Sequence, residues 1–195
     1  MVTELQMPFE QDEQENLQVR DIQRCVQQIS SRHSAAYRFI ACPSSDEIKL
    51  MLFNQDPFPA LIRLLQHTNS KVVGHAIITL NNIVVAGNDP TPDDQIHPHF
   101  ESMGKCGGLD QIFQLFRRNL DKYTKDRSAI CLGRIFRAQA IPNLAIRKEV
   151  IAHLKTLVKD PDSWIRSSSK NALRYLAYNA KNLAEISKDG FVIPE

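Results

Sequence analysis

Two histidines and two aspartates form a short cluster whose side chains could bind a metal ion. His97 and His99 flank one proline and follow Asp93 and Asp94. Imidazole and carboxylate groups are ordinary zinc ligands, but a metal site needs them at fixed positions, such as two positions one helical turn apart. These four residues instead lie in a proline-rich stretch without that spacing, which is typical of a loop. We predict a solvated loop here, with no metal site and no metal cofactor.

Four cysteines could serve as nucleophiles, metal ligands or disulfide partners. They are Cys25, Cys42, Cys106 and Cys131. No two of them form a CxxC motif, and none has a cysteine or histidine neighbour at zinc spacing. We predict four separate, reduced and mostly buried thiols, as expected in a reducing compartment.

Other patterns that could carry catalysis do not fit their motifs. The glycines from Gly104 to Gly108 lack the preceding strand and the spacing of a phosphate-binding loop, so we interpret them as a bend between helices. No Gly-x-Ser-x-Gly motif is present. The single tryptophan, Trp164, lies at a predicted turn, where we expect it to pack as a cap and not to bind a partner. We predict that the protein is not an enzyme and needs no cofactor.

Charge is distributed unevenly along the 195 residues. The first thirty residues hold six acidic residues and two arginines, and we expect residues 1–15 to be disordered and residues 16–195 to form one domain. Residues 111–181 hold fifteen Lys or Arg and five Asp or Glu. No apolar run reaches the roughly 20 residues of a membrane helix, and no signal-peptide pattern opens the chain. We predict a cytosolic or nuclear protein with no membrane partner.

Three segments of the chain align with one another, which indicates internal repeats. The segments are Pro59–Ile83, Leu109–Ile135 and Val150–Leu176. Leu80, Leu132 and Leu173 occupy the same register and are 52 and 41 residues apart. The period of helical armadillo and HEAT repeats is about 40–47 residues. A proline-rich insertion at residues 88–99 accounts for the longer first interval.

Apolar residues within each segment follow a helical period. Val72, Ala76, Leu80 and Ile83 fall on one face of an α-helix. Small residues recur beside this stripe and would let neighbouring helices approach closely: Ala76, Thr79, Ser128, Cys131, Ser169 and Ala172. The pattern predicts an all-α protein built from stacked helix pairs.

The array extends beyond the three aligned segments. We expect repeats at residues 45–87, 100–140 and 142–181, and a partial repeat at 182–195. Each full repeat should open with a short first helix, in Ser45–Phe53, Phe100–Cys106 and Ile141–Ile146. Two further helices, Leu17–Ile29 and Ser34–Ala41, should cap the open end of the stack. Helix caps are expected within His67–Ser70 and Lys159–Ser163.

The segment Phe58–Gly87 resembles an armadillo repeat, the unit of the β-catenin and importin-α families. The resemblance rests on Pro59-Ala-Leu-Ile-x-Leu-Leu65 and Ala76-x-x-Thr-Leu-x-Asn-Ile83. The third repeat, with Asp160-Pro-Asp-Ser-Trp-Ile-Arg166, is similar to the related HEAT pattern. The resemblance implies a right-handed α-α superhelix with about three full repeats, whose successive third helices form a concave surface. In armadillo proteins an Asn on each third helix typically clamps the backbone of an extended peptide.

This resemblance implies a set of partner-binding residues, one group on each third helix. The groups are His75, Ile78 and Asn82; Arg127, Ile130 and Arg134; and Ser168, Asn171 and Tyr175. Only Asn82 keeps the family residue, because Arg134 and Tyr175 occupy the equivalent positions. Two guanidinium groups in the groove would favour carboxylates or phosphates. The alternatives are a structural Asn82, solvated Arg127 and Arg134, and a packing role for Tyr175.

The resemblance therefore implies a non-catalytic scaffold that binds an extended, acidic or phosphorylated peptide, or a partner protein, on its concave helical face. The basic second half motivates an alternative, binding of nucleic acid such as RNA. The incomplete fourth repeat motivates another, a structural subunit that docks through its open ends. The sequence leaves the partner and the oligomeric state open.

Overall fold

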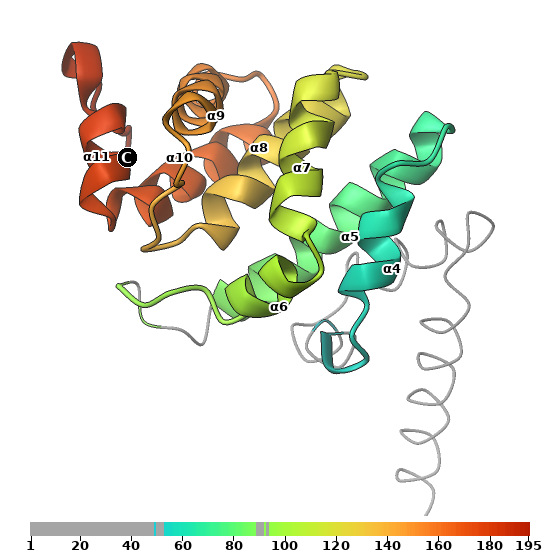
Figure 1. The fold of residues 1–195 in the computed structure, drawn as a ribbon. Coiled ribbons are helices and arrows are strands. Elements are labelled where there is room, and N and C mark those ends of the chain that lie inside the picture. Colours follow the sequence, from blue (N-terminus) through green and yellow to red (C-terminus); the bar gives the residue numbers. More distant parts are fainter. Residues whose placement is uncertain (1–48, 50–52, 89–91, 93) are drawn as a thin grey trace, which may run out of the picture.

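The structure, a computed structural model, describes residue 49 and residues 53–88, 92 and 94–195 (Figure 1). The predicted disordered segment 1–15 and the predicted helices Leu17–Ile29 and Ser34–Ala41 lie outside the described residues. Most of the predicted first helix Ser45–Phe53 does so too.

All regular elements of the described residues are helices, as predicted. They are α4 (Phe58–Leu64), α5 (Ser70–Asn88), α6 (Phe100–Lys105), α7 (Gly108–Arg118), α8 (Lys122–Ile135), α9 (Leu144–Leu157), α10 (Ser163–Ala177), α11 (Ala180–Ile186) and a short 3-10 helix (Lys188–Gly190). None of the described helices is long and apolar enough to cross a membrane.

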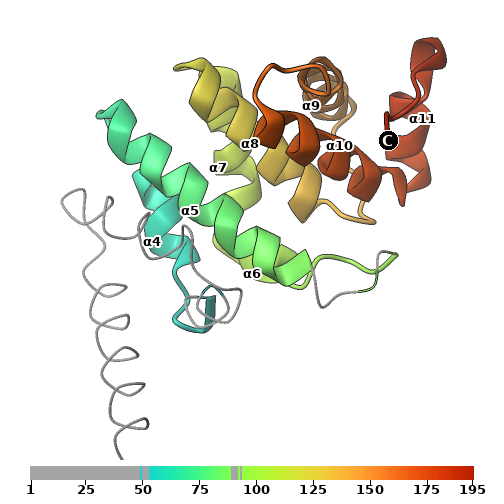
Figure 2. The same ribbon diagram turned by 180° about the vertical axis from the view of Figure 1, so that it is seen from behind.

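The helices stack in two layers. Helices α5, α8 and α10 lie side by side in one layer, which faces the viewer in Figure 2, and α8 contacts both of the others. Helices α4, α7 and α9 form the second layer and face the viewer in Figure 1. Each helix of the first layer packs against the helix that precedes it in its repeat. The arrangement is an α solenoid.

The core lies between the two layers and is built from the repeated positions. Leu80, Leu132 and Leu173 are at most 1% exposed, which confirms the predicted register. Hydroxyl groups within the core also have partners. The buried Thr79, Ser128 and Ser169 donate to a backbone carbonyl one turn earlier in their own helices, at 2.8, 2.7 and 2.9 Å. Small hydroxyl residues can therefore line the helix contacts without an unsatisfied polar group.

Side-chain caps begin several helices and separate the repeats. The capping residues are Asn69, Asp121, Asn143, Asp162 and Asn179. The Asp162 carboxylate accepts from the N–H groups of Trp164 and Ile165 at 2.8 and 3.1 Å. The caps at Asn69 and Asp162 fall in the two segments where we expected them. Each accepting oxygen satisfies N–H groups that a helix cannot pair internally.

The third repeat lacks its predicted short first helix. Residues 141–143 are not helical, and α9 begins at Leu144. The Ile141 N–H donates to the Asn182 side chain at 3.2 Å, and Asn143 caps α9, so the chain runs straight from the bend into the longer helix. The prediction of a helix at Ile141–Ile146 is therefore wrong.

His97 and His99 are buried, contrary to prediction, whereas the described loop residues 92, 94–96 and 98 are exposed as expected. The two histidines are 1% and 2% exposed. The His97 ring bonds the Val84 carbonyl of α5 at 2.9 Å, and the His99 ring stacks on Phe53 with centroids 3.7 Å apart. Gly87 leaves the necessary space, because a Cβ there would lie 2.8 Å from His99 Nε2. The two rings pack against Val84 and Gly87 of α5. The composition of the loop alone does not predict this burial.

Replacing Gly133 by alanine is expected to destabilise the fold by about 1–3 kcal/mol, because α8 and α10 approach closely at this residue. A Cβ at Gly133 would lie 2.7 Å from the Ala172 Cβ and 3.2 Å from a Leu154 methyl group. Gly74, inside α5, is the matched control, since its added Cβ would meet only Tyr123 at an ordinary 3.5 Å. Gly74→Ala should be neutral or stabilising by up to about 1 kcal/mol. Urea unfolding of both variants measures the difference, and equal effects would disprove the close approach.

Candidate functional site

The layer formed by α5, α8 and α10 carries the residues that we predicted for partner binding (Figure 2). We call its outer surface the α5–α8–α10 face. The three helices contain a single acidic residue, Asp126, which is 2% exposed. Its side chain bonds His153 of α9 and does not lie on this outer surface. Eight basic residues lie on the same helices: Lys71, Lys122, Lys125, Arg127, Arg134, Arg166, Lys170 and Arg174. These helices are therefore strongly cationic.

Arg134 connects the three helices of this face. One terminal nitrogen of its guanidinium donates to the Asn81 Oδ1 of α5 at 3.1 Å, and the other donates to the Ser168 Oγ of α10 at 3.2 Å. Arg134 and Ser168 are 7% and 4% exposed. Both residues therefore hold the scaffold together, and a direct role of either residue in partner binding stays a prediction.

Arg127 lies two helical turns before Arg134 on α8 and contacts two aromatic rings. Its guanidinium carbon is 4.1 Å from the centroid of the Tyr123 ring and 4.3 Å from that of the Trp164 ring. The two rings are 40% and 39% exposed. The Nε and Nη1 atoms of Arg127 have no hydrogen-bond partner. We name Tyr123, Arg127 and Trp164 the aromatic–arginine cluster.

A hollow of about 270 Å³ adjoins this cluster between the first turns of α5 and α8. The residues that line it are Ser70, Lys71, Gly74, His75, Asp121, Tyr123 and Thr124. Tyr123 belongs to both the cluster and the wall of the hollow. Gly74 keeps the floor open, because the nearest atoms to a Cβ added there would be those of the Tyr123 ring. The hollow is large enough for one side chain of a bound peptide.

The structure separates the remaining predicted residues into surface and core. His75 lines the hollow, and Asn82 is half-buried with a side-chain nitrogen that has no partner. Ile78 and Ile130 are 6% and 0% exposed. Both isoleucines are therefore buried, and Ile130 belongs to the hydrophobic core between the helices. Their role in partner binding stays a prediction.

The third group of predicted residues lies on α10 beside the end of the described chain. Asn171 accepts from Arg174 at 3.1 Å, and the half-buried Tyr175 ring lies 5.1 Å from the Arg137 guanidinium carbon. The Pro194 carbonyl accepts from Arg174 at 3.1 Å, and the Glu195 carbonyl accepts from Lys170. The chain's own final residues thus bind the cations at this end of α10, whereas none of the described residues fills the hollow between α5 and α8.

The sequence analysis did not include Tyr123 and Trp164 among the partner-binding residues. It placed the peptide-clamping Asn of α5 at Asn82, whereas the neighbouring Asn81 bonds Arg134. A signal for the aromatic pair was present. Tyr123 precedes Arg127 by four residues, and Trp164 precedes Ser168 by four, so each ring continues a predicted stripe by one helical turn. Trp164 is exposed and does not act as a buried cap, which corrects our expectation for it.

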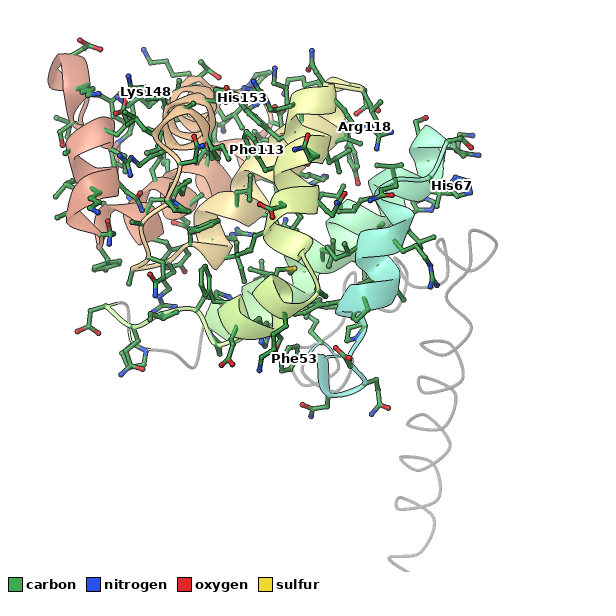
Figure 3. The ribbon with its side chains drawn as sticks, in the orientation of Figure 1. Phe53, His67, Phe113, Arg118, Lys148 and His153 are labelled. Carbon is green, nitrogen blue, oxygen red and sulfur yellow. The ribbon has the colours of Figure 1, made fainter. Side chains whose placement is uncertain are left out.

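A network of charges on the other side of α8 is structural. Lys122 Nζ lies 2.5 Å from Asp126 and 2.6 Å from Asp160, and His153 bonds Asp126 at 2.8 Å. Burial raises the pKa of Asp126, but hydrogen bonds from His153 and Lys122 outweigh it and hold this pKa below its usual range. The Lys122 ammonium likewise lowers the pKa of Asp160. The network ties α8 to α9 and to the turn before α10 (His153 is labelled in Figure 3).

The described cysteines are not activated nucleophiles. Cys106 and Cys131 are free thiols, and burial raises the pKa of Cys131 to about 12 and that of Cys106 above its usual value. A reactive cysteine needs the opposite shift, because the thiolate is the nucleophile. Across the described residues no three His, Cys, Asp or Glu side chains are arranged to hold a metal ion.

Comparisons with known proteins identify the fold. No protein-family profile and no curated protein matches the sequence. An engineered protein solved as a structural genomics target is similar, with TM-score 0.60 and 19% identity, over 87% of this chain and 68% of that one. A computationally designed armadillo repeat protein for modular peptide recognition is similar with TM-score 0.57 and 16% identity, over 87% and 69%. The chain thus has the fold of an armadillo-type repeat protein, as the sequence predicted.

Proposed function

We propose that this protein is a non-catalytic scaffold that binds an extended acidic peptide across its α5–α8–α10 face. One observation carries the proposal: the hollow on this face is lined by Lys71 and adjoins Arg127, a cation with unpaired donors, while the only acidic residue within the three helices, Asp126, is buried and already paired. A cationic surface attracts ligands of the opposite charge and disfavours like-charged ones. A similar fold has been designed for modular peptide recognition, which supports a peptide as the class of ligand.

The geometry favours a peptide over a nucleic acid. Single-stranded nucleic acids stack their bases on aromatic side chains with open faces. On this face, the exposed Tyr123 and Trp164 rings already stack on Arg127. Docking through the open ends of the stack stays a prediction. We also propose a cytosolic or nuclear location, in line with the free thiols of Cys106 and Cys131.

Selection from a random peptide library tests the proposal. The full chain is expected to enrich peptides rich in Asp and Glu, because Lys71 and Arg127 lie at the open end of the face. Reversing both charges, with Lys71→Glu and Arg127→Glu, should abolish this enrichment. The matched control is Lys148→Glu, which changes an exposed lysine of α9 in the opposite layer (Figure 3).

Some outcomes of the library experiment would contradict the proposal. No enrichment by the unmodified chain, or enrichment of Lys- and Arg-rich peptides, would overturn the acidic-peptide proposal. Steep loss of binding to single-stranded RNA with rising salt, without any peptide selection, would favour the nucleic-acid alternative.

A further inference from the structure

The aromatic–arginine cluster places one guanidinium group against two aromatic rings. The Arg127 guanidinium carbon lies 4.1 Å from the centroid of the Tyr123 ring and 4.3 Å from that of the Trp164 ring. The two rings come from different helices, since Tyr123 is on α8 and Trp164 opens α10. Contact with both rings restricts the rotational freedom of the Arg127 side chain, so binding at the guanidinium costs less conformational entropy.

The edge of this guanidinium has donors without acceptors. Nε and Nη1 of Arg127 have no hydrogen-bond partner, and no described carboxylate forms an ion pair with Arg127. Arg134, which is buried in the same helix, has acceptors on both of the neighbouring helices. Unpaired donors on a desolvated cation are costly and are usually satisfied by a partner or a bound anion. Arg127 therefore differs from Arg134 because its Nε and Nη1 atoms have no hydrogen-bond acceptor.

The chemistry of the cluster favours a ligand group with a negative charge. Exposed Trp and Tyr faces commonly bind cations through the negative face of the ring. Here one face of each ring is occupied by Arg127, so a lysine or arginine of a ligand would be repelled by the cation already in place. An oxyanion would instead be attracted to the guanidinium, whose N–H groups pair well with carboxylate or phosphate oxygens.

We propose that Tyr123, Arg127 and Trp164 form an anchor for one oxyanion side chain of a bound peptide, and that the neighbouring 270 Å³ hollow receives an adjacent side chain. The inference rests on the proposed function and names the residue type at one position of the ligand. A carboxylate and a phosphate share the necessary chemistry. The hollow shares the Tyr123 ring with the anchor, so the two subsites lie side by side along the peptide.

The fluorescence of Trp164 tests this anchor directly. The chain contains one tryptophan, so its intrinsic emission reports on the cluster alone. The probes are three labelled peptides of about ten residues that differ at one central position, which is Glu, phosphoserine or Gln. Label anisotropy measures binding to the face as a whole, and Trp164 emission measures contact at the anchor.

The Glu or the phosphoserine peptide is expected to bind at least tenfold more tightly than the Gln peptide and to change the Trp164 emission in a saturable way. The tighter of the two identifies the natural source of the oxyanion. Arg127→Gln should abolish both the preference and the emission change. Lys148→Gln, an exposed change on the opposite layer, should preserve both.

Two readouts separate failure of the anchor from failure of the proposed function. If all three peptides bind equally, or if Arg127→Gln keeps the preference, the anchor is overturned while peptide binding stands. If no acidic peptide changes the anisotropy at all, the proposed function itself fails. Trp164→Leu provides a second test by anisotropy alone, because loss of one covering ring should also weaken the preference for the oxyanion. Circular dichroism checks that each variant keeps its helices.

Discussion

Replacing Arg134 by alanine is expected to lower the free energy of unfolding by about 3 to 5 kcal/mol, because each lost hydrogen bond to a charged group costs about 1.5 to 3 kcal/mol. Arg134 is 7% exposed and bonds both Asn81 and Ser168, so its removal leaves two buried acceptors without their donor. Asn81 already has an unpaired side-chain nitrogen and would lose its only described side-chain bond. The contacts of α8 with α5 and with α10 should therefore both weaken.

Chemical denaturation of Arg134→Ala, Arg134→Met and Arg117→Ala measures this effect. Methionine keeps most of the buried volume, so the difference between the first two variants separates lost packing from lost hydrogen bonds. Arg117 pairs with Glu149 on the surface, where the side chains are 58% and 38% exposed, and its removal should cost less than about 1 kcal/mol. A stable Arg134→Ala variant with impaired peptide binding would instead place Arg134 among the partner-binding residues.

Lowering the pH from 6.5 to about 5 is expected to remove roughly 3 kcal/mol of stability through His97 and His99. Burial lowers the pKa of His97 to about 3 and that of His99 to about 4, from an ordinary value of 6.5. Arg134 and Arg137 add to the effect on His97. The unfolded chain therefore takes up protons in this range while the folded chain does not, so stability is present above pH 6.5 and is lost as the pH falls. Each histidine contributes about 1.4 kcal/mol per pH unit.

The hydrogen bonds of His97 explain why its neutral form is required. The Val84 carbonyl can only accept, so Nε2 must carry the proton of that 2.9 Å bond. Nδ1 accepts the backbone N–H of His99 at 3.0 Å. A second proton on Nδ1 would break this bond and place a charge in a buried site.

Urea unfolding at several pH values between 6.5 and 5 measures the slope of stability on pH. His99→Phe should roughly halve the part of the slope due to the two histidines, because phenylalanine can keep the stacking on Phe53 without titrating. An unchanged slope in this variant would show that His99 is already protonated in the folded chain.

Much of the fold follows from the sequence, because it depends on local periodicity. The recurrence of Leu80, Leu132 and Leu173 at helical spacing identifies the buried stripe of each repeat, and the structure confirms it. Asn69 and Asp162 indicate where two helices begin, since a cap acts on N–H groups only two or three residues away. The all-helical class, the starts of α5 and α10 and the core stripe were therefore predictable from neighbouring residues alone.

The roles of the polar residues were decided only by the tertiary structure. Arg127 and Arg134 lie on one stripe of one helix and look equivalent in the sequence. Arg134 is buried because its acceptors come from Asn81 and Ser168, which are 53 and 34 residues away, whereas Arg127 stacks on a ring of α10 and keeps unpaired donors. Burial and hydrogen bonding depend on which helices become neighbours in the folded protein. A local sequence pattern does not specify these neighbours, because they come from distant parts of the chain.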